Sequence, residues 1–108
     1  MLKNIDCPLN HTMLLIGNKW KPLLLFHLLE GELRSGELQK SVVGISNKMF
    51  TQTIRELEKD NLVERKIFPV VPPKVEYKLS ERGKSLEPIL RSLDHWGLDD
   101  LKRDASKK

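Results

Sequence analysis

The chain has 108 residues, of which 39% are hydrophobic, and its 19 Lys and Arg against 15 Asp and Glu give a net charge of +4. This length favours one domain spanning residues 1–108, and no apolar run approaches the roughly 20 residues that a transmembrane helix needs. The single cysteine excludes an internal disulfide, and no charged leader with a cleavage site opens the chain. We therefore expect a cytoplasmic protein whose modest positive charge is compatible with an anionic partner.

Two apolar helices are predicted in the first third of the chain. The first runs from Pro8, a residue tolerated in a first helical turn, to Ile16. It is so rich in apolar residues that we expect burial on more than one side, and a partner subunit could supply the second side. The next helix runs from Lys19 to Glu30 and is expected to form the centre of the core.

Residues 35–60 fit a helix-turn-helix, in which two short helices are joined by a tight turn. Ser35 is expected to cap the first helix, which continues to about Val42, and Gly44 is expected to supply the turn. Ser46 is expected to cap the second helix, because its hydroxyl can accept from exposed amides of the first turn.

The second helix of this pair separates apolar from polar side chains. At roughly 100° per residue, Phe50, Ile54 and Leu57 fall on one side. Lys and Arg neutralise phosphates, while Gln and Arg can form paired hydrogen bonds with base edges. Taken alone, the pattern also fits an ordinary solvated surface helix. The side chains on the polar face are Lys48, Gln52, Arg55 and Lys59.

An alternating pattern follows and predicts a β-hairpin over residues 62–79, a wing. Residues 62–68 and 75–79 read as strands, and the three prolines between them cannot donate ladder hydrogen bonds, which indicates a stiff protruding loop. The basic side chains of this hairpin include Arg65, Lys66 and Lys74.

The last predicted helix spans about residues 80–101, with Ser80 as its cap. Gly83 and Pro88 are poor residues for a helix interior, so its first part is expected to be irregular or kinked. Its apolar stripe is long for the end of a small domain and includes Leu86, Ile89, Leu90, Leu93 and Trp96.

Together these elements predict a mainly α protein with a small β-hairpin, the winged helix-turn-helix arrangement. In that arrangement the second helix enters the major groove of DNA, and the hairpin contacts the backbone or the minor groove. The capped helices around a glycine turn, the basic polar face and the basic wing agree with one another. They favour double-stranded DNA as the partner.

Several segments resemble the HxlR family of bacterial transcription regulators over residues 7–97: Cys7-Pro8, residues 15–20, 44–49 and 55–63, and residues 72–77. The resemblance implies a fold similar to MarR-type winged helices and a homodimer acting on an inverted-repeat operator, with repression expected. It identifies neither the operator nor the inducer. It also implies N- and C-terminal dimerisation helices, for which the candidate interface residues are Leu9, Met13, Ile16, Leu86, Ile89, Leu90, Leu93 and Trp96.

Ten residues are candidate DNA contacts. Gln52 and Arg55 are the expected base readers, and a good bidentate contact contributes about 1–3 kcal/mol of discrimination. Each of the others could face phosphate or solvent, and the two serines could serve only as helix caps. The set is Ser35, Ser46, Lys48, Thr51, Gln52, Arg55, Lys59, Arg65, Lys66 and Lys74.

Cys7 is a candidate redox sensor because it begins a helix, where the dipole favours a thiolate. In the resembled family a cysteine at this position serves as a redox switch in some members. The partner thiol would be the Cys7 of a second subunit or a small thiol. The alternative is a small residue that packs at the dimer interface.

Other functions have weaker support. A thiol enzyme using Cys7 lacks an evident base, so we expect no enzymatic activity and no cofactor. His11, His27 and His95 lack ligand-like spacing, and no metal is expected. A winged-helix module that binds protein instead of DNA remains the main alternative.

Overall fold

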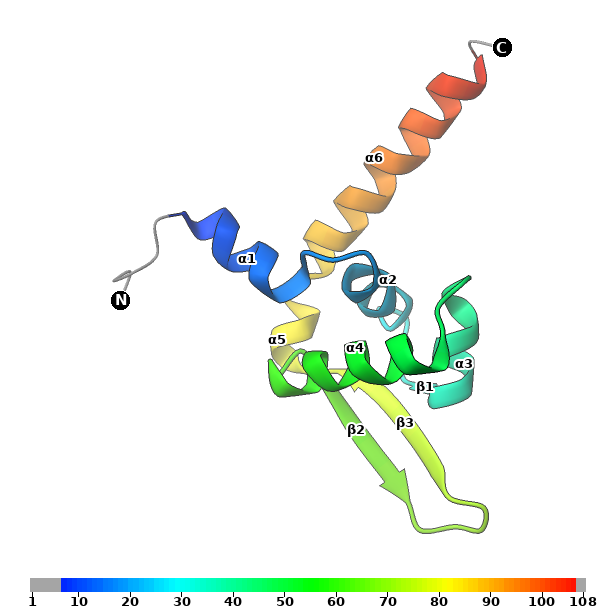
Figure 1. Cartoon of the computed structure of the whole chain (residues 1–108). Coiled ribbons are helices and arrows are strands. Elements are labelled where there is room, and N and C mark those ends of the chain that lie inside the picture. Colours follow the sequence, from blue (N-terminus) through cyan, green and yellow to red (C-terminus); the bar gives the residue numbers. More distant parts are fainter. Residues whose placement is uncertain (1–6, 107–108) are drawn as a thin grey trace.

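The computed structural model describes residues 7–106 of the chain (Figure 1). The fold is mostly helical with a small antiparallel sheet, as expected for a winged helix-turn-helix. The elements are α1 (Pro8–Ile16), α2 (Trp20–His27), β1 (Leu33–Arg34), α3 (Ser35–Ser41), α4 (Asn47–Lys59), β2 (Val63–Phe68), β3 (Lys74–Leu79), α5 (Glu81–Lys84) and α6 (Glu87–Ser106).

The predicted hairpin is confirmed within one residue at the start of each strand, but the sheet contains a third strand that was missed. Its order is β1-β3-β2, so β3 lies in the middle and pairs antiparallel on both sides. Tyr77 of β3 lies between Leu33 of β1 and Arg65 of β2. A strand as short as β1 has no alternating pattern to reveal it.

The core lies where α2, α3 and α4 pack with the sheet. Phe50 of α4 meets Tyr77 of β3 edge-to-face, with ring centroids 6.3 Å apart. All three helices contribute fully buried side chains. Those with at most 1% of their surface exposed include Leu24, Leu25, Leu38, Ile54 and Leu57. α2 is therefore the central helix, as expected.

Side-chain caps fix where the helices begin. The Oδ1 of Asn18 accepts from the amides of Trp20 at 2.9 Å and Lys21 at 2.8 Å, which satisfies two exposed donors in the first turn of α2. The expectation that this helix reaches Glu30 is wrong, because α2 ends at His27 and residues 28–30 form turns.

The expected role of Ser35 as a cap is also wrong. α3 begins at Ser35 itself, and Arg34 holds the N-cap position. The backbone amide of Arg34 donates to the Oε1 of Glu37 at 2.9 Å, so a carboxylate in the first turn supplies the cap instead of the serine hydroxyl.

The predicted C-terminal helix is broken into α5 and α6, in agreement with the expected irregularity. Ser80 caps α5: its hydroxyl accepts from the amide of Gly83 at 3.0 Å and donates to the carbonyl of Asn61 at 2.6 Å. A Cβ at Gly83 would lie 2.1 Å from the carbonyl oxygen of Leu62, so only glycine fits this approach. α6 then continues to Ser106, beyond the predicted end at residue 101.

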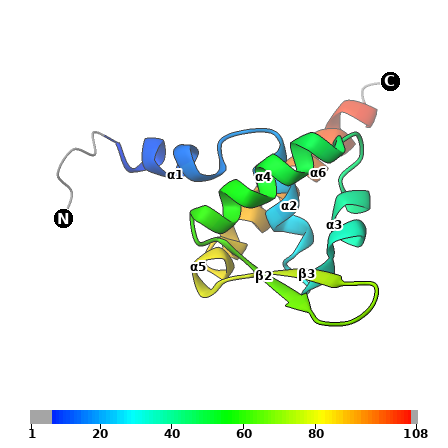
Figure 2. The same ribbon diagram turned by 60° about the horizontal axis from the view of Figure 1, so that its bottom comes forward.

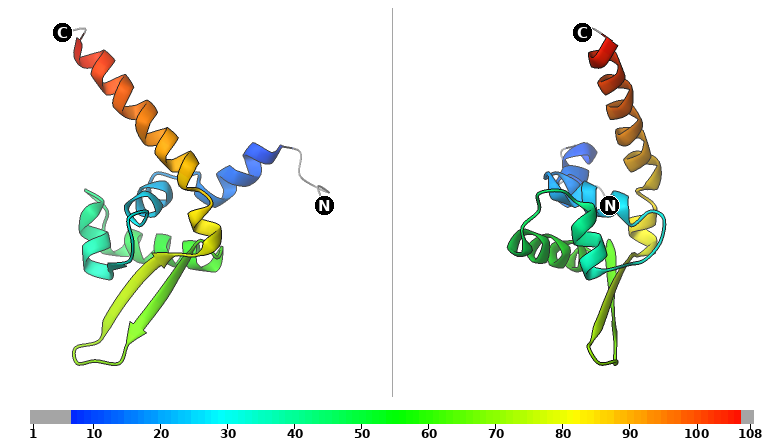
Figure 3. Two further views of the ribbon diagram at one scale, coloured as in Figure 1. Left: turned by 180° about the vertical axis from the view of Figure 1, so that it is seen from behind. Right: turned by 90° about the vertical axis from the view of Figure 1, so that its right-hand side faces the viewer.

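The helices and the wing separate into two ends of the molecule. α4 and the wing, defined as β2, β3 and residues 69–73 between them, lie at one end (Figures 1 and 2). α6 extends from the body in the opposite direction, and α1 leaves it to one side (Figure 3). Within residues 7–106, no helix is long and apolar enough to cross a membrane.

Candidate nucleic-acid interface

Residues next to the start of α4 determine where the helix begins, as predicted. Gly44 adopts a φ of +88° in the turn before it, a conformation that suits glycine. The hydroxyl of Ser46 accepts from the amide of Met49 at 3.0 Å, which confirms its role as the N-cap. Ile45 and Phe50 on either side of the cap are both buried in the core. The direction of α4 is therefore fixed at its first turn.

The two faces of α4 differ as the sequence predicts. Phe50, Ile54 and Leu57 are buried, together with Thr53, which was not foreseen and is 1% exposed. The predicted polar contacts are exposed, and most of them line one shallow depression, which we call the α4 surface. It consists of Asn47, Lys48, Thr51, Gln52, Arg55 and Glu56, and Lys59 is exposed at the end of the same helix.

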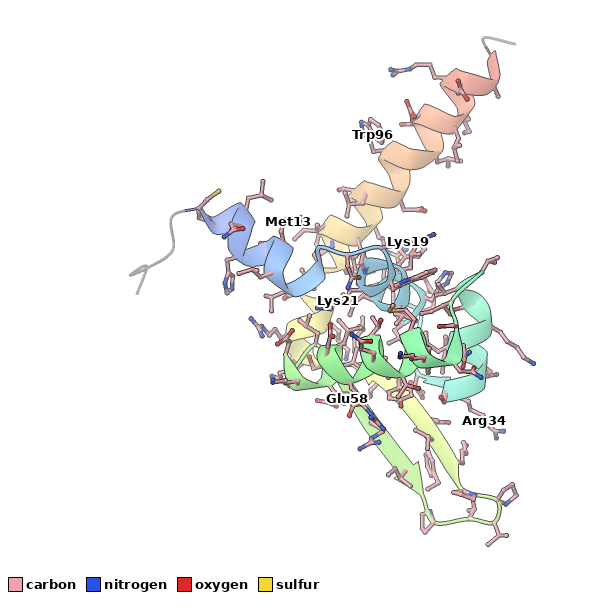
Figure 4. The ribbon with its side chains drawn as sticks, in the orientation of Figure 1. Met13, Lys19, Lys21, Arg34, Glu58 and Trp96 are labelled. Carbon is pink, nitrogen blue, oxygen red and sulfur yellow. The ribbon has the colours of Figure 1, made fainter. Side chains whose placement is uncertain are left out.

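A charged pair beneath the α4 surface was missed. Lys21 of α2 is only 8% exposed, and its Nζ lies 3.1 Å from the Oε1 of Glu56 on α4. Figure 4 shows Lys21 between these two helices. The hydrogen bond from Lys21 holds the pKa of Glu56 below its ordinary value of 4.5. The residues are far apart in the sequence, so no local pattern could join them.

The last turn of α3 lies close to the first turn of α4. The side-chain amide of Gln39 on α3 donates to the Oδ1 of Asn47 on α4. Ser35 is half-buried in the first turn of α3, and the Ser46 hydroxyl is engaged as a cap. Their contacts with phosphate stay predictions.

The wing presents its cations on two different faces. Arg65 pairs across the sheet with Tyr77, and its Nε lies 3.5 Å from the Oε2 of Glu58 on α4. Figure 4 shows Glu58 on the side of α4 next to the wing. Lys66 pairs with Glu76 and therefore lies on the opposite face of the sheet.

Near the tip of the wing, two lysines converge on one ring. The Nζ of Lys66 lies 4.8 Å from the centroid of Phe68, and that of Lys74 lies 4.5 Å from it. Lys74 also forms an ion pair with Glu76, with 3.2 Å between Nζ and Oε2. Lys74 therefore has a carboxylate partner before any DNA is present.

The end opposite the wing exposes apolar side chains. Trp96 on α6 is 69% exposed and Met13 on α1 is 45% exposed, both away from the wing (Figure 4). Leu9, Ile89 and Leu93 are likewise exposed.

Three of the residues expected at a dimer interface are less accessible. Ile16 and Leu90 are 3% and 2% exposed within the chain, so they belong to its own core and have almost no surface left for a partner. Leu86 is partly buried against the same core.

Cys7 is exposed and occupies the N-cap position of α1, directly before Pro8. Its carbonyl accepts from the amide of His11 at 3.3 Å. Among residues 7–106, no group of three or more His, Cys, Asp or Glu side chains gathers as metal ligands would.

Comparison with known proteins agrees with this geometry. Residues 15–105 match the model of the HxlR-like helix-turn-helix family. The chain is 47% identical to YkvN of Bacillus subtilis (strain 168), an uncharacterized HTH-type transcriptional regulator, over 89% of this chain and 81% of YkvN.

Solved structures of a redox regulator, HypR, have the same fold. The oxidized form is 42% identical with a TM-score of 0.83, covering 86% of this chain and 96% of that one. The reduced form is 39% identical with a TM-score of 0.84, covering 93% and 99%. The exposed α4 surface, the wing and these similarities agree, and the chain belongs to the HxlR-like helix-turn-helix family of DNA-binding transcriptional regulators.

Proposed function

We propose that this regulator acts in the cytoplasm as a homodimer that binds an inverted-repeat operator and represses the adjacent gene. The observation that carries the proposal is the division of the surface. One end exposes the polar α4 surface and the wing, and the other exposes apolar side chains on α1 and α6. The end with the polar α4 surface and the wing is suited to binding a DNA duplex. The end with the exposed apolar side chains is suited to binding a second copy of the chain.

In this proposal α4 enters the major groove. Gln52 and Arg55 are exposed on its outer side and have the donors and acceptors that base edges recognise. Lys48 and Lys59 are exposed cations at the two ends of the helix and contact phosphates, which position the protein without reading sequence. The exposed Arg65 on the wing adds a contact beside α4.

A second copy covers the apolar side chains of α1 and α6. Large exposed residues such as Trp96 at 69% are unusual on a monomer of this size, and a dimer removes them from water. Two α4 helices related by a two-fold axis read two half-sites, which in related arrangements lie roughly 34–36 Å apart. A dimer bound across a promoter then excludes polymerase.

Oxidant control through Cys7 is the second part of the proposal. Its thiol is exposed at the start of α1, an element we assign to the dimer interface. A protein of similar fold and 42% identity is named a redox regulator. A change at Cys7 therefore acts on the packing of the two subunits.

A salt titration tests DNA binding directly. The full chain is mixed with a duplex from the DNA upstream of its own gene and, separately, with a random duplex. The affinity for each is measured between about 50 and 200 mM salt. We expect a steep loss with salt for both duplexes and tighter binding to the upstream region. Weak, salt-independent binding to both would favour a protein-binding module. A reporter fused to the upstream region tests repression.

A further inference from the structure

Glu56 is an unusual residue to find on the α4 surface. It follows Gln52 by one helical turn and lines the same depression, and its side chain is 42% exposed. A carboxylate that faces a phosphate backbone repels it. Its presence among the DNA-facing residues therefore needs a reason.

Lys21 holds this carboxylate from the side of the core. Lysine is rarely buried without a partner, and the Nζ of Lys21 lies 3.1 Å from the Oε1 of Glu56. The amide of Lys21 donates to the Oδ1 of Asn18 at 2.8 Å, which anchors the lysine in the first turn of α2. The ammonium group therefore has a fixed place, and one oxygen of Glu56 is tied to it.

The other oxygen of Glu56 holds Gln52. The Nε2 of Gln52 donates to the Oε2 of Glu56 at 3.4 Å. An ionised carboxylate only accepts hydrogen bonds, so it meets the NH₂ side of the amide and not the carbonyl side. The order of donor and acceptor on Gln52 is thereby set, with the carbonyl oxygen and the second N–H left for DNA.

We propose that Glu56, fixed by Lys21, is the positioning residue for Gln52 and thereby selects adenine at the base pair that Gln52 meets. The inference rests on the proposed DNA-binding function. Adenine presents the N7 acceptor beside the N6 amino donor, and the outward N–H and carbonyl oxygen of an oriented glutamine match both. An amide that turns freely presents either order and discriminates less.

Selection from a pool of random duplexes tests the proposal. The full chain, Gln52→Ala and Glu56→Gln are each used to capture duplexes, which are then sequenced. Wild type is expected to enrich adenine at one position in each half-site. Gln52→Ala and Glu56→Gln are both expected to reduce that preference by roughly tenfold at the same position and to leave the other positions unchanged. In Glu56→Gln the Lys21 ammonium, which only donates, takes the carbonyl oxygen of the new amide, so the NH₂ of that amide faces Gln52 and no longer favours the orientation that suits adenine.

Two further variants complete the test. Glu58→Gln makes the same charge change on the same helix without touching Gln52 and is expected to keep the adenine preference. Lys21→Met, checked for folding by circular dichroism, is expected to weaken it. The inference is overturned if Glu56→Gln keeps the full preference, if it changes every position alike, or if Gln52→Ala has no position-specific effect. A wild-type chain that enriches no sequence would overturn the proposed function as well, which separates the two failures.

Discussion

The Nε of Arg65 on the wing lies 3.5 Å from the Oε2 of Glu58 on α4. Strand pairing places Arg65 opposite Tyr77 on the face of the sheet that meets α4, whereas Lys66 pairs with Glu76 and lies on the other face. Two adjacent cations therefore belong to different surfaces. Of these two residues, only Arg65 lies on the face of the wing that meets α4.

This difference predicts unequal effects of two neighbouring substitutions. Arg65→Ala is expected to weaken duplex binding several-fold and to lower the slope of log affinity against log salt by about one, because a phosphate contact beside α4 is lost. Lys66→Ala removes the same charge from the opposite face and is expected to change the slope less. Fluorescence anisotropy over a salt series measures both, and equal losses would show that both faces of the wing meet DNA.

Arg55→Ala is expected to reduce sequence selectivity while the fold is retained. The side chain is exposed on the α4 surface, so removing it leaves the core unchanged. Losing a bidentate base contact costs about 1–3 kcal/mol of discrimination between operator and random duplex. Competition binding with the two duplexes measures the ratio, and thermal unfolding checks the fold. Lys84→Ala, which removes an exposed cation from α5, is the matched control and is expected to keep the ratio.

Leu93→Asp or Trp96→Ala is expected to weaken dimerisation. Both side chains are more than half exposed in the single chain, and they fall on one side of α6 with Ile89. Sedimentation over a concentration series measures the dissociation constant, and a tight dimer at micromolar concentration would contradict the interface. Leu98 is the matched control, because helical geometry places it about 180° around α6 from Ile89. Leu98→Asp is expected to weaken the dimer less.

The parts of the fold that sequence analysis predicted correctly are those with a local cause. Ser46 caps α4 because its hydroxyl reaches an amide three residues away, and Gly44 turns the chain because it lacks a Cβ. The faces of α4 follow from helical periodicity alone. The exposure of Gln52 and Arg55 on the polar face of α4 could therefore be predicted from the sequence, and their contacts with bases stay predictions.

The parts that were missed depend on residues far apart in the chain. β1 exists because Leu33 pairs with Tyr77 of β3, and two residues are too few to show the alternating pattern of a strand. Ile16 was expected at a subunit interface, yet it is 3% exposed because the C-terminal end of α1 meets the chain's own core. The pairing of Lys21 with Glu56 likewise needs two helices to be placed first.

Oxidation is expected to change DNA affinity only when Cys7 is present. Diamide takes two protons and two electrons from two thiols, which joins Cys7 to the Cys7 of a second chain or, with added glutathione, to that thiol. Either product alters the exposed start of α1. Operator affinity is measured before and after diamide for wild type and Cys7→Ser, with dithiothreitol added afterwards to reverse the change. Equal responses in both proteins would remove Cys7 as the sensor.

The ion pair between Lys21 and Glu56 predicts a pH-dependent part of the stability. The pKa of Glu56 lies below its ordinary value in the folded chain, chiefly because Lys21 donates to it. The stabilisation is therefore present above the ordinary carboxylate pKa and is lost as the pH falls through the lowered folded value. Since the Glu56 side chain is 42% exposed, water screens the pair, and we expect about 1 kcal/mol or less.

Urea unfolding of wild type and Glu56→Gln measures this contribution. Wild type is expected to be the more stable near pH 7, and the difference between the two is expected to shrink as the pH falls below the ordinary carboxylate range and the Glu56 carboxylate becomes protonated. Glu81→Gln is the matched control, because the Glu81 side chain is 94% exposed and pairs only across one turn with Lys84 at 3.5 Å. The stability difference between Glu81→Gln and wild type is expected to stay near zero over the same pH range. A difference for Glu56→Gln that does not vary with pH would mean that the Lys21 ammonium does not stabilise the ionised form, and the fixed orientation of Gln52 would lose its physical basis.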